Sequence, residues 1–543
     1  MVRARTPLHR LTIATVASAI STVAFAATDP ANRLIEEQRN TTRQEQLSPP
    51  SPLPAQATPA LDTDPASIEE RGATLPAARI RVTSHGLVAP AVIETTLAPY
   101  RALDIGDTRL DLLVRQLTAR LVEAGRITSR AVVTRVSQRE RLIDIELMAG
   151  RIEAIHADGL SADALDRAMP LRTGDTLSIE ALEQGLHQIN RLRMFDARIR
   201  ILPGSTALNN RVDLSMQTGR SWRVSVGLDN QGQQSTGTGR ARIQTRIENT
   251  LGLLDDIQLA YLRSERSEAW LGSVAVPDGF NTWSATVSAS HSSIALQGFE
   301  YDTRSTTVVF GFNRVLRLDR EGRDAFDLSL IRARSARRYG PIGLQTDRST
   351  VVRGAWTHLT RRARHQFYIE PAISIGLAAL GAIEDDDMLR KTDTHHQFVK
   401  LALNAGAVAI VTPALEYAAQ LQAQRSHVSL AGLEQMSLGG LASVRGFRDA
   451  ALSGDTGYAL RQELRFPDAF GPSAPALTPY AHLDAGAVWL TGAERLSLSS
   501  LGLGLRHNAD GLIGEAVISA PLRRTHFNDN HSWRLHFQLA YEF

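Results

Sequence analysis

Over the last eleven residues of the chain, Trp533 to Phe543, large apolar side chains alternate without interruption with side chains that are polar except for Ala540. Successive side chains of a β-strand point to opposite faces, so this segment predicts a strand with one apolar face and one polar face. Such a strand suits a wall between lipid and a water-filled lumen, and aromatic residues stand at both of its ends, where the membrane interfaces would lie. We therefore predict a transmembrane strand; the alternative is an edge strand of a soluble sheet.

The amino terminus predicts export across a membrane. Three arginines precede an apolar run, residues 11–26, that closes on Ala24-Phe25-Ala26, the small-x-small pattern of a signal-peptidase site. We assign residues 1–26 to a signal peptide and expect the mature chain to begin near Ala27. The rest of the chain holds no apolar stretch of the about 20 residues that a spanning helix needs. If the mature protein sits in a membrane, it must do so as a β-barrel.

Composition argues against several classes of function. The 60 basic residues outnumber the 57 acidic ones by three, and the three arginines of the signal peptide account for that difference. The mature chain is therefore neutral, which gives no support to a nucleic-acid partner. Because the chain has no Cys, no GxxxxGK[ST] phosphate loop and no HExxH motif, we predict no enzymatic activity, no cofactor and no metal. The acidic run from Glu384 to Asp387 lies near His395 and His396, but we interpret it as an exposed loop and not as a metal site.

The mature chain opens with a polar segment. Asp29-Pro30 has the form of a helix N-cap followed by a first-turn proline, and the residues after it are almost all polar. A helix of this kind buries nothing by itself, so it must be disordered or lie in a wet place such as a pore. We assign residues 27–47 to a polar, plug-like helix. The Pro-rich stretch that follows predicts an extended linker over residues 48–76.

Between residues 77 and 218 the chain shows the same order of elements twice. In each half a short strand is followed by two helices and two further strands, and the second helix carries an apolar stripe. The stripe consists of Leu110, Leu113, Val114, Leu117 and Leu121 in the first half, and of Ile179, Leu182, Leu186 and Ile189 in the second. We predict two β-α-α-β-β domains at residues 77–150 and 151–218; an unrelated pair of small α+β domains is the alternative.

From residue 219 onwards, almost every segment alternates in the same way as the last strand. Counting such runs between turn signals gives about sixteen strands, an even number as expected of a single-chain outer-membrane barrel. The predicted fold class is therefore mainly β: a transmembrane β-barrel at residues 219–543, preceded by the two β-α-α-β-β domains and the N-terminal helix. We expect the long loops, at 335–348, 377–393 and 426–454, on the outer side.

The loop at residues 426–454 contains Val444-Arg445-Gly446-Phe447. Together with the two modules, this VRGF sequence resembles the outer-membrane translocation and assembly superfamily, in which the modules are periplasmic POTRA domains and VRGF lies between strands eleven and twelve. The partner motif of that superfamily, F-x-D-x-G, matches His482-Leu483-Asp484-Ala485-Gly486, with histidine in the aromatic position.

The resemblance implies a latch between Arg445 and Asp484 inside the lumen. The alternation of the strand independently places Asp484 on its polar face, and a buried Arg–carboxylate pair is bidentate and specific in orientation. Gly446 would let the loop backbone turn or approach the wall closely. The alternative is that both charges are merely solvated. His482 leaves open how side chains pack beside the latch.

Several features resemble one branch of this superfamily, the two-partner secretion transporters of the haemolysin activation/secretion type. They are the presence of only two modules, the N-terminal helix with its linker, and the sequences at residues 182–192, 229–232 and 249–256. The resemblance implies an outer-membrane transporter with its modules in the periplasm. It would recognise an unfolded β-helical exoprotein, such as an adhesin or haemolysin, and move it to the cell surface without nucleotide hydrolysis.

The same resemblance implies the partners. They are a secreted exoprotein encoded nearby, the lipids of the outer membrane, and the barrel-assembly machinery, which would recognise the closing strand that ends on the aromatic Phe543. An insertase of the same superfamily, which folds other barrels, is the main alternative function, and a passive porin is a weaker one.

Overall fold

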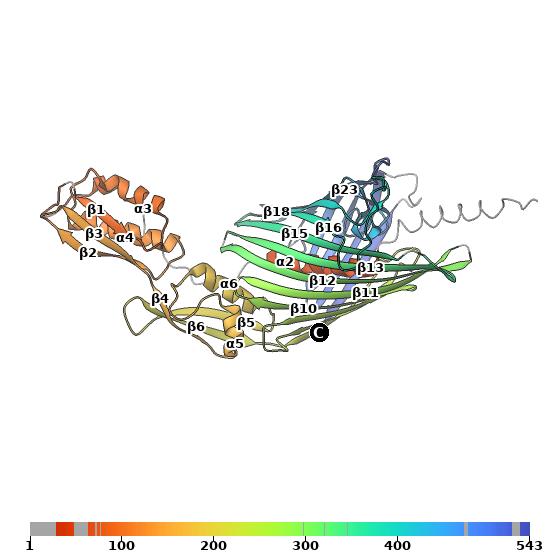
Figure 1. The fold of residues 1–543 in the computed structure, drawn as a ribbon, viewed down its shortest axis with the longest axis horizontal. Helices are drawn as coiled ribbons and strands as arrows, with labels where there is room; N and C mark the ends of the chain where they lie inside the picture. Colours follow the sequence, from red (N-terminus) through yellow and green to blue (C-terminus); the bar gives the residue numbers. More distant parts are fainter. Residues whose placement is uncertain are drawn as a thin grey trace, which may run out of the picture.

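The computed structural model places three bodies in a row: a first β-α-α-β-β module, a second one, and a barrel with a helix inside it (Figure 1). It describes residues 29–47, 63–70, 73–76, 78–296, 298–319, 321–344, 346–467, 469–471, 476–523 and 533–543. The predicted signal peptide and the first part of the predicted linker, residues 48–62, lie outside the described residues.

The first module is a three-stranded sheet covered by two helices. Its elements are β1 (Arg79–Thr83), α3 (Pro90–Leu97), η2 (Ala98–Tyr100), α4 (Asp107–Glu123), β2 (Arg130–Ser137) and β3 (Leu142–Met148). The central strand β3 runs parallel to β1 and antiparallel to β2. The expected stripe of α4 is buried against the alternate residues Ile143, Ile145 and Leu147 of β3, so period-3.6 and period-2 apolar patterns meet in one core.

This module begins before the boundary that the sequence suggested. The short helix η1 (Pro65–Ser67) buries Pro65, and the backbone of Leu75 pairs with that of Ile105. Glu70 accepts hydrogen bonds from the backbone N–H groups at the start of α4. Burial opposes the ionisation of Glu70, but these N–H groups outweigh it and lower the pKa of this carboxyl. The later part of the predicted linker therefore packs on the module, since a helix cap can come from a distant residue.

The second module repeats the topology. Its elements are β4 (Arg151–Ala157), α5 (Ala162–Ala168), α6 (Ile179–Asn190), β5 (Phe195–Pro203) and β6 (Asn209–Thr218). Here β6 is central, parallel to β4 and antiparallel to β5. The core around Leu182, Leu186 and Ile189 also takes in Leu254, which belongs to a turn of the barrel. The two bodies therefore share one apolar core.

In the described residues, sixteen wall strands close into the barrel, each antiparallel to its neighbours. They are β7 (Trp222–Asp229), β8 (Arg240–Glu248), β9 (Asp256–Arg263), β10 (Ser267–Asp278), β11 (Asn281–Leu296), β12 (Phe299–Asp319), β13 (Gly322–Tyr339), β15 (Asp347–Arg362), β16 (His365–Gly376), β18 (Val399–Thr412), β19 (Leu415–Ser426), β23 (Thr456–Arg465), β24 (Leu477–Trp489), β25 (Leu496–Ala509), β26 (Leu512–Arg523) and β27 (Arg534–Glu542). The last strand, β27, pairs with the first, β7, and closes the ring.

The closing strand shows the predicted division of faces. The apolar residues from Trp533 to Phe543 are between 43% and 60% exposed, whereas His536, on the other face, is 3% exposed. The outward side chains form part of a belt of exposed aromatic and aliphatic residues around the barrel. Among the described residues, no helix combines the length and the apolar character needed to cross a membrane.

One predicted loop is wrong. Residues 335–348 are mostly strand, because β13 runs to Tyr339, β14 (Ile342–Gly343) pairs back on it, and β15 starts at Asp347. Together with β11 and β12, these strands form a ribbon that extends beyond the rest of the wall (Figure 1). Many side chains at its tip are polar on both faces. The apolar–polar alternation therefore ends there, although the backbone pairing continues.

The other two expected loops lie between wall strands and carry short elements of their own. These are β17 (Thr394–His395), β20 (Ser429–Leu430), η3 (Gly432–Glu434), β21 (Met436–Leu438) and β22 (Leu452–Gly454). The strands β17 and β20 pair with each other and so join the two loops. The VRGF loop connects β19 to β23, the eleventh and twelfth wall strands, as expected.

Candidate functional site: the barrel lumen

The structure brings Arg445 and Asp484 together. The guanidinium donates from Nε to Asp484 Oδ2 at 2.7 Å and from Nη2 to Asp484 Oδ1 at 2.7 Å, and the backbone N–H of Arg445 donates to Oδ2 at 3.1 Å. Both residues are fully buried. The pair is therefore bidentate and shielded from water, the geometry in which such a pair is most specific in orientation.

The ion pair is part of a larger charged network that the sequence did not reveal. Arg445 Nη1 donates to Glu463 on β23 at 2.6 Å, and Arg506 on β25 donates to the same carboxylate at 2.8 Å. Arg506 also donates to Glu515 on β26 at 2.9 Å, as does the hydroxyl of Tyr480 at 2.6 Å. The Tyr480 ring lies 5.5 Å from the Arg445 guanidinium and 4.2 Å from that of Arg506. The sequence analysis did not single out these residues, because only the strand register shows which inward side chains meet.

The other residues of the VRGF motif fix the loop backbone. Val444 and Phe447 pack into an apolar cluster with Leu438 and Val488. A Cβ at Gly446 would lie 2.5 Å from the Cβ of Ser500, a distance that atoms do not tolerate, so the loop comes this close to the wall only with glycine.

Two histidines also lie near the latch. His482 is buried and hydrogen-bonds through Nε2 to the Ser519 hydroxyl at 2.8 Å, while its Nδ1 lies 3.2 Å from Asp484 Oδ2. A histidine therefore fills the aromatic position beside the latch. On the closing strand, His536 Nε2 donates to the carbonyl of Arg445 at 2.8 Å. Phe543 itself is exposed on the outer face, and its backbone N–H donates to Val224 on β7.

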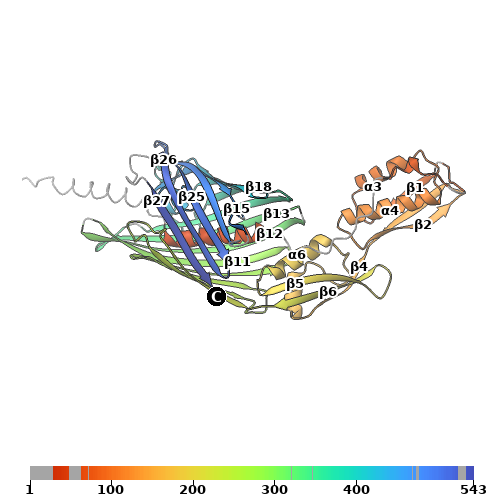
Figure 2. The same ribbon diagram turned by 180° about the vertical axis from the view of Figure 1, so that it is seen from behind.

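The helix α2 (Pro30–Leu47) lies inside the barrel (Figures 1 and 2). Most of its contacts with the wall are polar: Arg43 donates to both oxygens of Glu370 at 2.7 and 2.9 Å, Gln38 donates to Ser273 at 2.5 Å, and Glu37 pairs with Arg242 at 2.8 Å. These partners come from β8, β10 and β16. The polar side chains of α2 therefore pair with polar side chains that line the lumen.

Two further contacts of α2 could not be foreseen. Leu34 is buried against a small apolar patch of the inner wall, formed by Leu262, Ala269 and Leu271. Arg33 forms an ion pair with Asp449, which follows the VRGF motif in the same loop. The plug helix and the VRGF loop therefore touch each other inside the barrel.

The helix α6 attaches the second module to the barrel. The buried amides of Gln184 and Gln188 donate to the carbonyl of Gly279, in the turn between β10 and β11, at 3.0 and 2.9 Å. Arg191 donates to the carbonyl of Leu254 at 2.8 Å. Burial, followed by the nearby guanidiniums of Arg323 and Arg191, lowers the pKa of His187 on the same helix to about 3, so this imidazole is neutral at physiological pH.

The sequences at residues 229–232 and 249–256 also form joints. Asp229 pairs with Arg240 at 2.6 Å, and the Asn230 side chain hydrogen-bonds to the backbone of Leu535 and Phe537 in the closing strand. Buried Asp255 accepts N–H groups of its own turn and holds Leu254 in the core of the second module. Both sequences therefore fix the start of the barrel, one to the last strand and one to the module.

The acidic run near His395 and His396 does not assemble into a metal cluster in the part of the chain that the structure describes. Asp385 instead accepts hydrogen bonds from the backbone N–H groups of His396 and Gln397 and lies 3.1 Å from His395 Nδ1. These bonds hold the loop between β16 and β18 in shape.

Comparisons with known proteins agree with this geometry. A family model described as "Haemolysin secretion/activation protein ShlB/FhaC/HecB" matches residues 209–507, and a POTRA domain model matches residues 151–203. The outer membrane transporter CdiB of Escherichia coli is 30% identical over 84% of this chain and 78% of the relative. The hemolysin transporter protein ShlB of Serratia marcescens is 27% identical over 85% of this chain and 82% of that protein.

Solved structures show the same fold. CdiB from Escherichia coli matches with a TM-score of 0.82 at 26% identity, over 100% of both chains. CdiB from Acinetobacter baumannii matches with a TM-score of 0.77 at 18% identity, over 94% of this chain and 97% of the other, a likeness of fold alone.

The family model covers more than half of the chain and spans the joint between the second module and the barrel. The similarity therefore includes the parts that distinguish this architecture from a plain pore. The relatives named above are transporters, and membership of this transporter family implies a secreted protein as the partner. The chain belongs to the haemolysin secretion/activation protein family and is an outer-membrane transporter of two-partner secretion, with a POTRA domain in the periplasm.

Proposed function

We propose that this transporter binds an unfolded exoprotein with its two periplasmic modules and passes it through the barrel lumen without nucleotide hydrolysis. The observation that carries the proposal is the way in which the lumen is filled. The helix α2 occupies it but is held mainly by hydrogen bonds and ion pairs, which water or another polypeptide can replace. A filled lumen that can be vacated is what a conduit for a protein chain requires.

The modules offer the means of recognition. An unfolded chain has unpaired backbone groups, and it can extend a sheet by adding a strand at a free edge. In the first module the sheet order β1-β3-β2 leaves β1 and β2 at the edges, and Val132 and Val136 of β2 are exposed. These features support capture of an extended segment before it reaches the barrel.

The direction of transport comes from the exoprotein itself. A passenger that folds outside the cell buries its apolar surface there, and this burial favours exit over return without ATP. We propose a β-helical exoprotein of the adhesin or haemolysin type, encoded nearby. We further propose that the barrel-assembly machinery recognises β27 and that the exposed apolar belt contacts outer-membrane lipids.

The VRGF loop has a separate role in the proposal. Arg445 and Asp484, with Val444, Gly446 and Phe447, latch the loop to the inner wall and keep it folded in while the chain passes. An inward-folded loop that remained free to move would compete with the passenger for the lumen.

Deletion of residues 78–218 tests the proposal. Cells that carry the exoprotein and the deleted transporter should insert the barrel but export nothing. Export by the barrel alone would contradict the role of the modules. If the intact protein promotes insertion of unrelated barrels and exports no exoprotein, the insertase function takes its place.

A further inference from the structure

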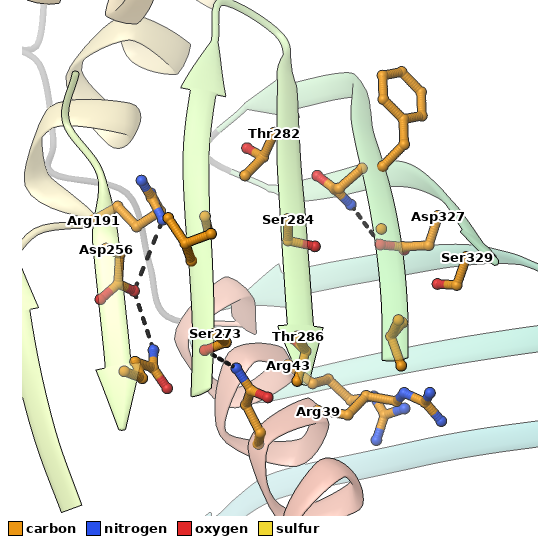
Figure 3. Close-up of a pocket in the computed structure, with 18 of the residues that line it drawn as sticks. Arg39, Arg43, Arg191, Asp256, Ser273, Thr282, Ser284, Thr286, Asp327 and Ser329 are labelled. Carbon is orange, nitrogen blue, oxygen red and sulfur yellow. Dashed lines mark hydrogen bonds and ion pairs between the residues drawn. The ribbon is translucent and has the colours of Figure 1, made fainter. Parts of the chain in front are cut away.

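A cavity of about 440 Å³ lies at the end of the lumen where the second module joins the barrel (Figure 3). It is bounded by α2, by α6, and by the inner faces of β9–β13, β15 and β16. Figure 3 shows Arg39 and Arg43 on α2 and Arg191 at another side of the cavity. Among the described residues, six arginines and three carboxylates line it, the arginines being Arg39, Arg43, Arg191, Arg193, Arg323 and Arg353 and the carboxylates Asp256, Asp327 and Glu370.

The carboxylates are already engaged. Glu370 accepts from Arg43 and, at 2.7 Å, from Arg353. Asp256 forms an ion pair with Arg246 at 2.8 Å and a longer one with Arg191 at 3.9 Å. The Asp327 carboxylate accepts a hydrogen bond from the Asn313 amide at 2.8 Å. Asp327 also acts electrostatically on Arg323, but three carboxylates face six arginines, so the cavity keeps an excess of positive charge.

Two arginines are left over. Arg323, on β13, is 5% exposed; its Nη2 donates to Asn313 at 3.3 Å, and its Nε and Nη1 atoms have no hydrogen-bond partner among the described residues. Within the described part of the chain, Arg39 on α2 forms no hydrogen bond or close ion pair. Buried guanidinium N–H groups without hydrogen-bond acceptors are costly, and an arriving oxyanion would relieve that cost with charge-assisted hydrogen bonds.

The rest of the lining suits a polypeptide better than a single ion. The hydroxyls of Ser273, Thr282, Ser284, Thr286 and Ser329 line the cavity beside the arginines (Figure 3). Its volume falls in the range of about 300–1,000 Å³ that holds molecules larger than one anion. Its position, between α6 and the plug helix, lies on the route of a chain that arrives from the periplasm.

We propose that this cavity binds acidic side chains of the exoprotein as it enters the barrel, with Arg323 and Arg39 as the main ligands. The proposal rests on the transport function proposed above and adds a class of substrate to it, a segment that carries Asp or Glu. Carboxylate and phosphate share the chemistry that a guanidinium recognises, so the test must separate a free anion from a polypeptide.

Binding to the full-length protein in detergent tests the proposal. The probes are a short peptide of alternating Glu and Ser, the same peptide with Gln for Glu, and inorganic phosphate, measured by titration calorimetry. We expect the Glu peptide to bind at least about ten-fold more tightly than the Gln peptide, since each charge-assisted hydrogen bond is worth about that factor or more. Arg323→Gln and Arg39→Gln should each weaken it by about ten-fold.

Arg337→Gln is the matched control. Arg337 lies on the same strand as Arg323 but pairs with Asp347 near the outer end of the barrel, so its loss should leave peptide binding unchanged. Heat-modifiable electrophoretic mobility establishes that each variant has a folded barrel. Because Arg39 is on the plug helix and not in the wall, its variant keeps the test decisive if Arg323→Gln fails to fold.

Three results would overturn the proposal: equal binding of both peptides, binding that neither substitution weakens, or phosphate binding that the Glu peptide does not displace. The last would assign the cavity to a free anion. A separate export assay keeps the two proposals apart. If the wild-type protein exports no exoprotein but binds the Glu peptide through Arg323, the transport function fails and the site for acidic segments stands. If the protein exports the exoprotein but does not bind the Glu peptide through Arg323, only the proposed site is rejected.

Discussion

Two elements lie inside the barrel, and they are held in opposite ways. The VRGF loop is fixed by a fully buried, bidentate ion pair, by a second carboxylate and by an apolar cluster. The plug helix α2 is held mostly by part-buried hydrogen bonds and ion pairs and by Leu34 in a small apolar patch. Removing one partner of a buried ion pair leaves the other charge buried without compensation, whereas water can replace a partly hydrated contact. We therefore expect the VRGF loop to remain fixed in the lumen and the helix α2 to be displaced more easily.

The largest effect is expected at the latch. Arg445→Ala leaves Asp484 buried without its guanidinium partner, which costs about 3–5 kcal/mol, whereas Glu463 keeps Arg506. The wall strands do not depend on this pair, so the barrel should insert while export falls by at least ten-fold. Export is measured as exoprotein in the medium per inserted transporter. Normal export by both Arg445→Ala and Asp484→Ala would show that the loop needs no latch.

Deletion of residues 31–47 should have the next largest effect, on conductance and not on folding. Removing α2 empties the lumen, so the conductance of single channels in planar bilayers should rise several-fold while the barrel remains heat-modifiable. An unchanged conductance would mean that the helix does not limit the pore. The same measurement on Arg445→Ala separates loss of the latch from loss of the plug.

A single contact of the helix should matter less. Arg43→Gln removes the pair with Glu370, but Glu370 keeps Arg353 and the helix keeps its other contacts. We expect openings to become about two- to ten-fold more frequent, the range for loss of a partly buried ion pair. Arg314→Gln, at an exposed position outside the plug contacts, is the control and should not change the frequency.

The smallest effect is expected at α6, the helix that attaches the second module to the barrel. The folded protein holds the pKa of His187 at about 3, below its ordinary 6.5, so the unfolded chain binds more protons between these values. Stability from this residue is therefore full above pH 6.5 and declines as the pH falls toward 3. His187→Gln should reduce the drop in thermal midpoint between pH 7.5 and pH 5. An identical drop in the variant would remove His187 as its cause.

The sequence predicted the central ion pair of the latch but not the other residues that contact the VRGF loop. Alternation placed Asp484 on the lumen face, and the family resemblance matched it with Arg445. Nothing in the pattern selected Glu463, Arg506 or Glu515, because strands β23, β25 and β26 each offer several inward polar residues and only their register decides which side chains meet. For the same reason the contact between Arg33 and Asp449 was not predictable.

The errors have a related origin. The pattern at residues 335–348 predicts a loop because polar side chains on both faces remove the alternation, although the backbone still pairs. Glu70 was assigned to a linker because a cap supplied from 36 residues away leaves no local signal. In both cases the deciding partner was distant in the sequence.

By itself the sequence determined most of the wall strands, the helical stripes of both modules and the order of the bodies, since each follows from the period with which apolar side chains repeat along a local segment. Only the tertiary structure decided that α2 lies in the lumen, that Leu254 completes the core of the second module, and that two guanidinium nitrogens of Arg323 are buried without a hydrogen-bond acceptor among the described residues. The physical reason is the range of the interactions. Periodicity is set by neighbours a few residues apart, whereas pairing and burial of charge depend on residues that closure of the barrel brings together.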